Sequence, residues 1–304
     1  MSNTTNRLRI TDYGLRISDY VCLPVSRDYG LRITDYACLP VGRDYGLRKE
    51  LKGQFLLFIL FLFCSFNGNC QTKIQGLPSC IEIGFKVSDN TFPTRWYNAK
   101  INARAEPLSK SEIEDVNEAL IQTLSKYPEK VICSYLKRIF VFKNMRFYNV
   151  PFGGTSSKDA VYITNDEENF TCSYDLLETY FHHEFSSILL NKNGCKFQKK
   201  KWKSLNPEGF HYGKGGLNAI LTGNAEMNFD PQLNERGFLT RYSEASLEED
   251  FNVFCQNVFN GGFLFWKLVD KIPAIKLKAD LVIQFYHRID PQFSESYFRK
   301  INQK

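Results

Sequence analysis

The chain lacks an apolar run long enough to span a bilayer as a helix. Its longest uninterrupted apolar stretch runs over nine residues, from Phe55 to Phe63, whereas a transmembrane helix needs about 20. We therefore expect no transmembrane helix in the mature protein.

A strong excess of charge of either sign is also lacking. Residues 1–70 hold nine of the 39 basic residues and six of the 33 acidic ones, so the remainder carries a net charge of about +3. A nucleic-acid partner usually requires a clustered basic surface on a clearly basic domain. The charge balance therefore argues against nucleic acid, and we interpret the basic run 199–203 as a solvated loop.

Cysteines are few and odd in number after residue 70, so at least one of them is unpaired. The sequence leaves the pairing open, except that it excludes a disulfide between Cys172 and Cys195. A continuous helix between these two residues would hold them about 30 Å apart, and a disulfide needs Cα atoms within about 7 Å. The five cysteines are Cys80, Cys133, Cys172, Cys195 and Cys255.

The amino-terminal part of the chain repeats itself almost word for word. The stretch from Asp19 to Arg32 returns sixteen residues later, from Asp35 to Arg48. Structural repeats vary at solvent positions and have longer periods, because each unit must bury one face on the next. We therefore interpret residues 1–48 as a translated repeat that is not part of the folded protein, with a tyrosine-rich adhesive tail as the alternative.

Residues 49–70 have the features of a secretory signal peptide. Lys49 and Lys52 precede the apolar stretch, and small residues at Gly68 and Cys70 precede a possible cut before Gln71. A lipid anchor fits less well, because neither Cys64 nor Cys70 follows the small residues that such a signal requires. We expect an exported protein, periplasmic, at the cell surface or secreted, whose domain comprises residues 71–304.

Hydrophobic periodicity in residues 71–304 predicts an α+β domain with a small mixed sheet and one long helix. The long helix spans 172–193 and stops at Gly194. Residues 202–240 are rich in Gly, Asn and Pro and predict an extended loop. The other expected helices span 109–125, 129–137, 246–259 and 276–288, and the expected strands span 81–87, 138–143 and 160–164.

Candidate chemistry lies on the long helix, in the segment 180–189. In a zinc peptidase, the pattern H-E-x-x-H places two imidazoles on one helix face, and its Glu can deprotonate metal-bound water. Here His183 and Glu184 take the first two positions, and Ser187 stands where the second His belongs.

This segment resembles the predicted zinc-binding metallopeptidases of exported bacterial proteins, zincins distantly similar to the anthrax lethal factor catalytic domain. Members commonly have H-H-E-F-G-H at this site. The similarity extends over about residues 107–260. It includes the turn 153–155 and strand 161–163 before the helix, the loop 206–210 after it, and the segments 237–242 and 248–251.

The resemblance implies roles for individual residues. His183 would be the first zinc ligand, Glu184 the general base and Glu249 the third ligand, with Asp250 supporting the ligands. Ser187 departs from the pattern, because a serine hydroxyl is a weak neutral ligand and catalytic zinc normally has three protein ligands plus water.

Two residues could substitute for the missing ligand. His182 is rotated about 100° from His183 around the helix and shares a face with Glu178, so these two side chains could hold a metal by themselves. His211 lies in a predicted loop and could fold back toward the site.

Ordinary structural roles explain the same residues without a metal. A His-His pair on a helix is often a hydrogen-bonded core feature. Ser246 and Glu249 also match a capping box, in which the Ser246 hydroxyl accepts from the Glu249 amide and the Glu249 side chain reaches back.

The sequence therefore favours an exported metallopeptidase-like domain with a degenerate zinc site, weakly active or inactive as a peptidase and able to bind a protein or peptide. Two alternatives stay open: an active zinc peptidase with a replacement ligand, and a non-enzymatic binding or structural domain.

Overall fold

The computed structural model describes residues 76–165 and 173–303. The predicted repeat (1–48), the predicted signal peptide (49–70) and Cys172 lie outside the described residues. The described chain mixes helices with two small sheets, and its longest helix is α3, Ser173–Asn193. The α+β class, the small mixed sheet and the long helix are confirmed.

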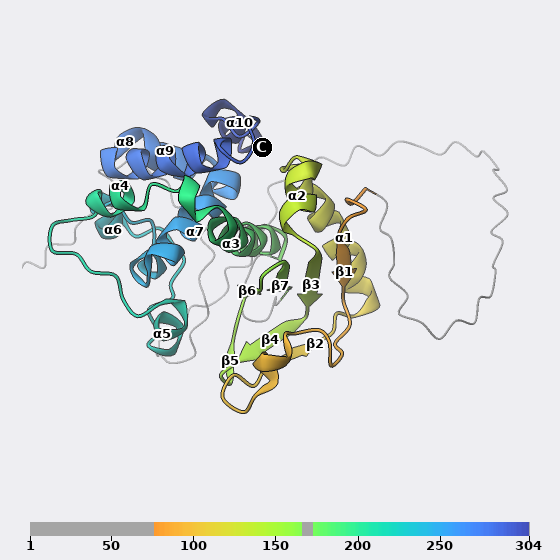
Figure 1. Ribbon diagram of the computed structural model, residues 1–304. Helices are drawn as coiled ribbons and strands as arrows, with labels where there is room; N and C mark the ends of the chain where they lie inside the picture. Colours follow the sequence, from red (N-terminus) through yellow and green to blue (C-terminus); the bar gives the residue numbers. More distant parts are fainter. Residues whose placement is uncertain (1–75, 166–172, 304) are drawn as a thin grey trace, which may run out of the picture. The chain divides into compact units, whose positions relative to one another are not determined.

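The larger sheet has the strand order β1-β3-β7-β6 (Figure 1). Strands β1, β3 and β7 are parallel, and β6 runs antiparallel to β7 at one edge. The smaller sheet is antiparallel, in the order β2-β4-β5. The strands are β1 (Glu82–Gly84), β2 (Arg104–Glu106), β3 (Arg138–Phe142), β4 (Asn144–Phe147), β5 (Val150–Pro151), β6 (Gly154–Ser156) and β7 (Ala160–Thr164).

The helices follow one another closely after β7, where α3 packs along α7 and against β6 and β7 (Figure 1). Besides α3, they are α1 (Lys110–Ser125), α2 (Glu129–Tyr135), α4 (Lys199–Ser204), α5 (Gly216–Leu221), α6 (Pro231–Glu235), α7 (Leu247–Asn260), α8 (Gly262–Lys271), α9 (Pro273–His287) and α10 (Glu295–Ile301), and the short 3-10 turns are Thr94–Tyr97, Gly194–Lys196 and Arg241–Glu244.

Alternating side chains on the central strands build two hydrophobic cores on opposite faces of the sheet. On β3, Ile139 and Val141 enter the main core, which also contains the apolar residues of α3 and α7. Phe140 and Phe142 face the other way, into a smaller aromatic cluster. Because side chains of a strand point to alternate faces, one buried strand serves both cores and places α3 firmly against the sheet.

Two predictions for the carboxyl-terminal half were wrong. Residues 202–240 are not an extended loop, because they include α5, α6 and the end of α4. The basic run 199–203 is not a loop, because it forms most of α4; its lysines are exposed, as expected, while Trp202 is fully buried. Lysine is a good helix former, and burial of one large aromatic side chain fixes this short helical turn against the rest of the domain.

Cys80 and Cys133 form a disulfide that ties the start of β1 to α2. Cys195 is exposed and unpaired, and Cys255 is buried and unpaired. Across residues 76–165 and 173–303, none of the helices has the length and apolar character needed to cross a membrane.

Candidate functional site

Helices α3 and α7 bring two of the predicted ligands together. His183 lies in the middle of α3 and Glu249 in the first turn of α7, and His183 Nε2 is 2.9 Å from Glu249 Oε2. Ser246 caps α7 and accepts from the Glu249 amide at 3.1 Å, as predicted. The Glu249 side chain, however, contacts His183, so the second half of the predicted capping box is wrong.

Both ring nitrogens of His183 have oxygen partners. Nδ1 lies 2.8 Å from Gln256 Oε1, and Nε2 faces the Glu249 carboxylate. Since a ring nitrogen must donate to an amide oxygen and to a carboxylate, the geometry corresponds to a doubly protonated imidazolium. Burial lowers the pKa of His183, but the hydrogen bond and charge of Glu249 outweigh burial and raise that pKa to about 9.

Ser187, at the position of the absent ligand, is held by a neighbour. Its hydroxyl accepts from Asn252 Nδ2 at 2.7 Å, and Asn252 Oδ1 accepts from the Ser186 hydroxyl at 2.8 Å. Asn252 therefore occupies the space next to Ser187 and links α3 to α7.

The sequence interpretation missed Asn252 and Gln256, although a signal for both was present. Glu249, Asn252 and Gln256 recur at spacings of three and four along α7. This spacing puts them on one face of α7, and that face is the one in contact with His183 and Ser187.

Glu184 lies on the sheet side of α3, beside the edge strand β6. A Cβ atom added to Gly154 would come within 3.0 Å of Glu184 Cγ and Oε1, so glycine is what permits this close packing. Burial raises the pKa of Glu184 to about 7, against the lowering effect of the His183 charge; the Glu249 charge adds to the rise. The Glu184 carboxyl is therefore buried between α3 and β6, and its pKa depends on the charges of His183 and Glu249.

Tyr242 closes another side of the site. Its ring centre lies 6.0 Å from that of His183. Burial, followed by the negative charge of Glu249, raises the pKa of the Tyr242 hydroxyl, which keeps it neutral. Tyr242 was considered in the sequence only as the end of the segment 237–242, and this contact was not predicted.

His182 belongs to a separate buried network and does not replace the missing ligand. Its Nε2 donates to Glu178 Oε1 at 3.0 Å, and its Nδ1 accepts from the Tyr127 hydroxyl at 2.7 Å. The Lys126 ammonium pairs with Glu178. The two side chains of the predicted Glu178–His182 metal pair are therefore already bound to each other, to the Lys126 ammonium and to the Tyr127 hydroxyl.

A catalytic zinc ion does not fit the donors present. Among the described residues, no group of three or more His, Cys, Asp and Glu side chains is arranged to hold a metal ion. His183 and Glu249 could supply two metal ligands, and they hydrogen-bond each other. At the position of the second histidine stands Ser187, whose hydroxyl is hydrogen-bonded to Asn252. His211, the other proposed substitute, has an exposed side chain.

Comparisons with known proteins match no family model and no curated protein. Among solved structures, the chain is similar to a protein of Bacteroides caccae described as a predicted zinc-binding metallo-peptidase. The TM-score is 0.45 and the identity 14%, over 74% of this chain and 85% of the other. Similarity this distant carries no conclusion about the site or its activity.

Asp250 lies next to Glu249 in the sequence but has different partners. Its Oδ2 accepts from Lys278 Nζ at 2.8 Å, Trp202 Nε1 at 2.9 Å and the Tyr212 hydroxyl at 2.7 Å. The Lys278 ammonium lies 4.1 Å from the ring centre of Phe238. In the structure, Gln256 rather than Asp250 supports His183, and Asp250 joins α7 to α4 and α9.

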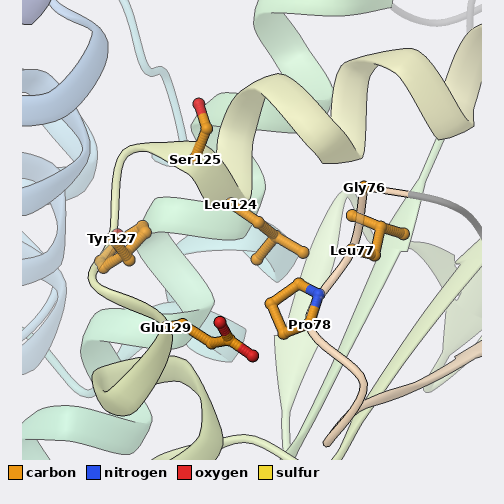
Figure 2. Close-up of a pocket in the computed structure, with 7 residues that line it drawn as sticks. All are labelled: Gly76, Leu77, Pro78, Leu124, Ser125, Tyr127 and Glu129. Carbon is orange, nitrogen blue, oxygen red and sulfur yellow. The ribbon is translucent and has the colours of Figure 1, made fainter.

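A cavity of about 220 Å³ lies apart from these residues, where α1 ends and α2 begins (Figure 2). Tyr127, which hydrogen-bonds His182, is on its wall. The residues that line this cavity do not form a catalytic or metal-binding cluster. Its lining residues are Gly76, Leu77, Pro78, Leu124, Ser125, Tyr127 and Glu129.

Proposed function

We propose that this protein is an exported, metallopeptidase-like domain that binds peptide without hydrolysing it, and in which a buried ion pair has taken the place of the zinc ion. The observation that carries the proposal is the third ligand position, where Ser187 stands in place of a histidine and accepts from Asn252 Nδ2 at 2.7 Å. The two remaining candidate ligands, His183 and Glu249, hydrogen-bond each other at 2.9 Å. Catalytic zinc needs a third protein ligand, and Ser187 is held by Asn252.

The edge strand β6 supports peptide binding. Among the described strands, only β7 pairs with it. Gly153 and Ser157, at its two ends, hydrogen-bond to β7 through O and N, respectively. In an antiparallel ladder the alternate residues then direct their N–H and C=O groups away from the partner strand. Gly154 and Ser156 therefore present an open strand edge, to which an extended peptide can add.

The disulfide supports the expected export. Cys80–Cys133 lies in the described part of the domain, and disulfides persist mainly in oxidising compartments outside the cytosol.

The first experiment tests the metal. After stripping with a chelator, the protein is titrated with zinc by calorimetry and assayed against a peptide library with and without zinc. We expect weak, substoichiometric zinc binding and no hydrolysis. Stoichiometric tight binding with hydrolysis that disappears in Glu184→Gln would establish an active peptidase instead.

The second experiment tests the strand edge. Ser156→Pro removes the outward N–H of β6, whereas Ser156→Ala removes only the hydroxyl and is the matched control. Using an immobilised library of extended peptides, we expect binding by the wild type and the Ala variant and a loss of at least tenfold in the Pro variant. Equal binding by all three would place the peptide elsewhere than on β6, and no binding by any of them would favour a structural role.

A further inference from the structure

Helix α5 lies on a segment whose two ends are held by backbone hydrogen bonds to the stretch 242–245. On one side, Gly213 N and Gly215 N donate to the carbonyls of Glu244 and Ala245, each at 2.9 Å. On the other side, Tyr242 N donates to the Glu226 carbonyl at 3.1 Å. The segment 216–225 is suspended between these two backbone anchors, and in Figure 1 α5 lies at the far end of a long connection from α4.

The suspended segment is internally bonded. The Thr222 hydroxyl donates to the Asn218 carbonyl at 2.8 Å, and Asn224 N donates to the Ala219 carbonyl at 2.8 Å. These bonds tie the chain after α5 back onto the helix, so the whole segment can move as one body.

The first residue of α5 lies directly on the candidate site. A Cβ atom added to Gly216 would overlap Glu249 Oε1 and the Tyr242 hydroxyl. With α5 in this position, the Glu249 side chain is only 17% exposed and that of His183 only 8%. A larger residue at 216 therefore requires that either α5 or the ends of the Glu249 and Tyr242 side chains move.

Little apolar burial holds α5 in place. Ala219 is buried, but neither hydrophobic core includes an α5 residue. Leu221 is 54% exposed. An element with few buried apolar contacts opens at a small free-energy cost compared with core helices such as α7.

Glycines in left-handed backbone conformations flank the helix. Gly215 has φ +99° and Gly223 has φ +70°, and a Cβ at either would have no atom within 4 Å. Both positions therefore have the conformational freedom and the space that a hinge needs.

We propose that α5 is a hinged cover that closes over the His183–Glu249 pair and opens to give a ligand access to it. This proposal rests on the proposed function in one respect only, namely that the ligand is a peptide. Opening at Gly215 and Gly223 uncovers Glu249, Tyr242 and His183 together, since Gly216 is the residue that contacts the first two.

Hydrogen exchange of the metal-free, peptide-free protein tests the cover. By mass spectrometry, amides of 217–223 in the wild type should be at least tenfold less protected than those of α7. In Gly216→Ala, protection of α5 should fall further, and exchange at the imidazole C2 of His183 should rise several-fold. His182, fully buried on the same helix, is the internal reference and should not change.

Gly194→Ala is the matched control, because a Cβ at Gly194 meets no atom within 4 Å. Equal protection of α5 and α7 in the wild type would overturn the proposal even if Gly216→Ala fails to fold. A folded Gly216→Ala with unchanged His183 exchange would overturn it as well. Neither result bears on metal or peptide binding, so the proposed function would stand or fall separately.

Discussion

Replacing Asp250 with asparagine tests whether this carboxylate supports a metal site or holds helices together. Asp250 and Lys278 form an ion pair in which both side chains are 0% exposed. Asp250→Asn keeps the shape but leaves the Lys278 ammonium buried without a counter-charge. Removing one partner of a buried pair costs about 3–5 kcal/mol, and we expect a loss in this range.

Replacing the other partner of the pair, Lys278, should reduce the free energy of unfolding by less. In Lys278→Met, the Asp250 carboxylate keeps two donors, Trp202 Nε1 and the Tyr212 hydroxyl. The cation's interactions with the surrounding aromatic rings are lost, each worth up to about 2 kcal/mol, but no unpaired ammonium remains. We therefore expect a smaller loss than in Asp250→Asn, and a double variant that is less destabilised than the sum of the two.

Urea unfolding of the four proteins at pH 7 measures these free energies. A loss below about 1 kcal/mol in Asp250→Asn would mean that the pair is solvated and does not join α7 to α9. An unchanged stability combined with an altered zinc affinity would restore the role that the family resemblance implies for Asp250.

Three further predictions concern the metal position, the disulfide and acid stability. Ser187→His should raise zinc affinity by several orders of magnitude, because it adds the third ligand beside His183; calorimetry without such a gain would contradict the placement of the ligand face. Cys80→Ser should destabilise the domain by about 4 kcal/mol, the loop-closure value for a separation of 53 residues; thermal unfolding with and without reductant checks this. Burial acts to raise the pKa of Glu178, but its bonds to His182 and Lys126 lower that pKa to about 2. Because the pKa is lower in the folded state, the ionised Glu178 stabilises the fold by about 3 kcal/mol above pH 4.5, and this stabilisation is lost as the pH falls toward 2. In Glu178→Gln, the free energy of unfolding should therefore depend less on pH between 4.5 and 2.

Local sequence patterns predicted the regular elements well where packing and local preference agree. The predicted strand 160–164 matches β7 residue for residue, and the predicted helix 109–125 matches α1, with Ser109 as its cap. Ser109 accepts from Glu112 N, and the Glu112 carboxylate bonds back to Ser109 N. The prediction of a loop over 202–240 failed at α4 because that helix packs Trp202 against Phe251 and Phe254 of α7, a contact remote in sequence. It failed at α6 because the local start signal, Asp230 as the cap followed by Pro231, was overlooked.

For the candidate site, the sequence by itself determined which side chains share a face of α3. A period of 3.6 residues puts His183 and Ser187 on one side and His182 with Glu178 on another, and the structure shows these two separate groups. Which residue meets each group was decided only by the tertiary packing of α3 on α7. Hydrogen bonds are directional and short, so the register of the two helices assigns Glu249 and Gln256 to His183 and Asn252 to Ser187. The same packing turned the Glu249 side chain away from the amino end of its own helix, because the buried imidazole of His183 offers a stronger, charge-assisted partner than the backbone amide of the cap.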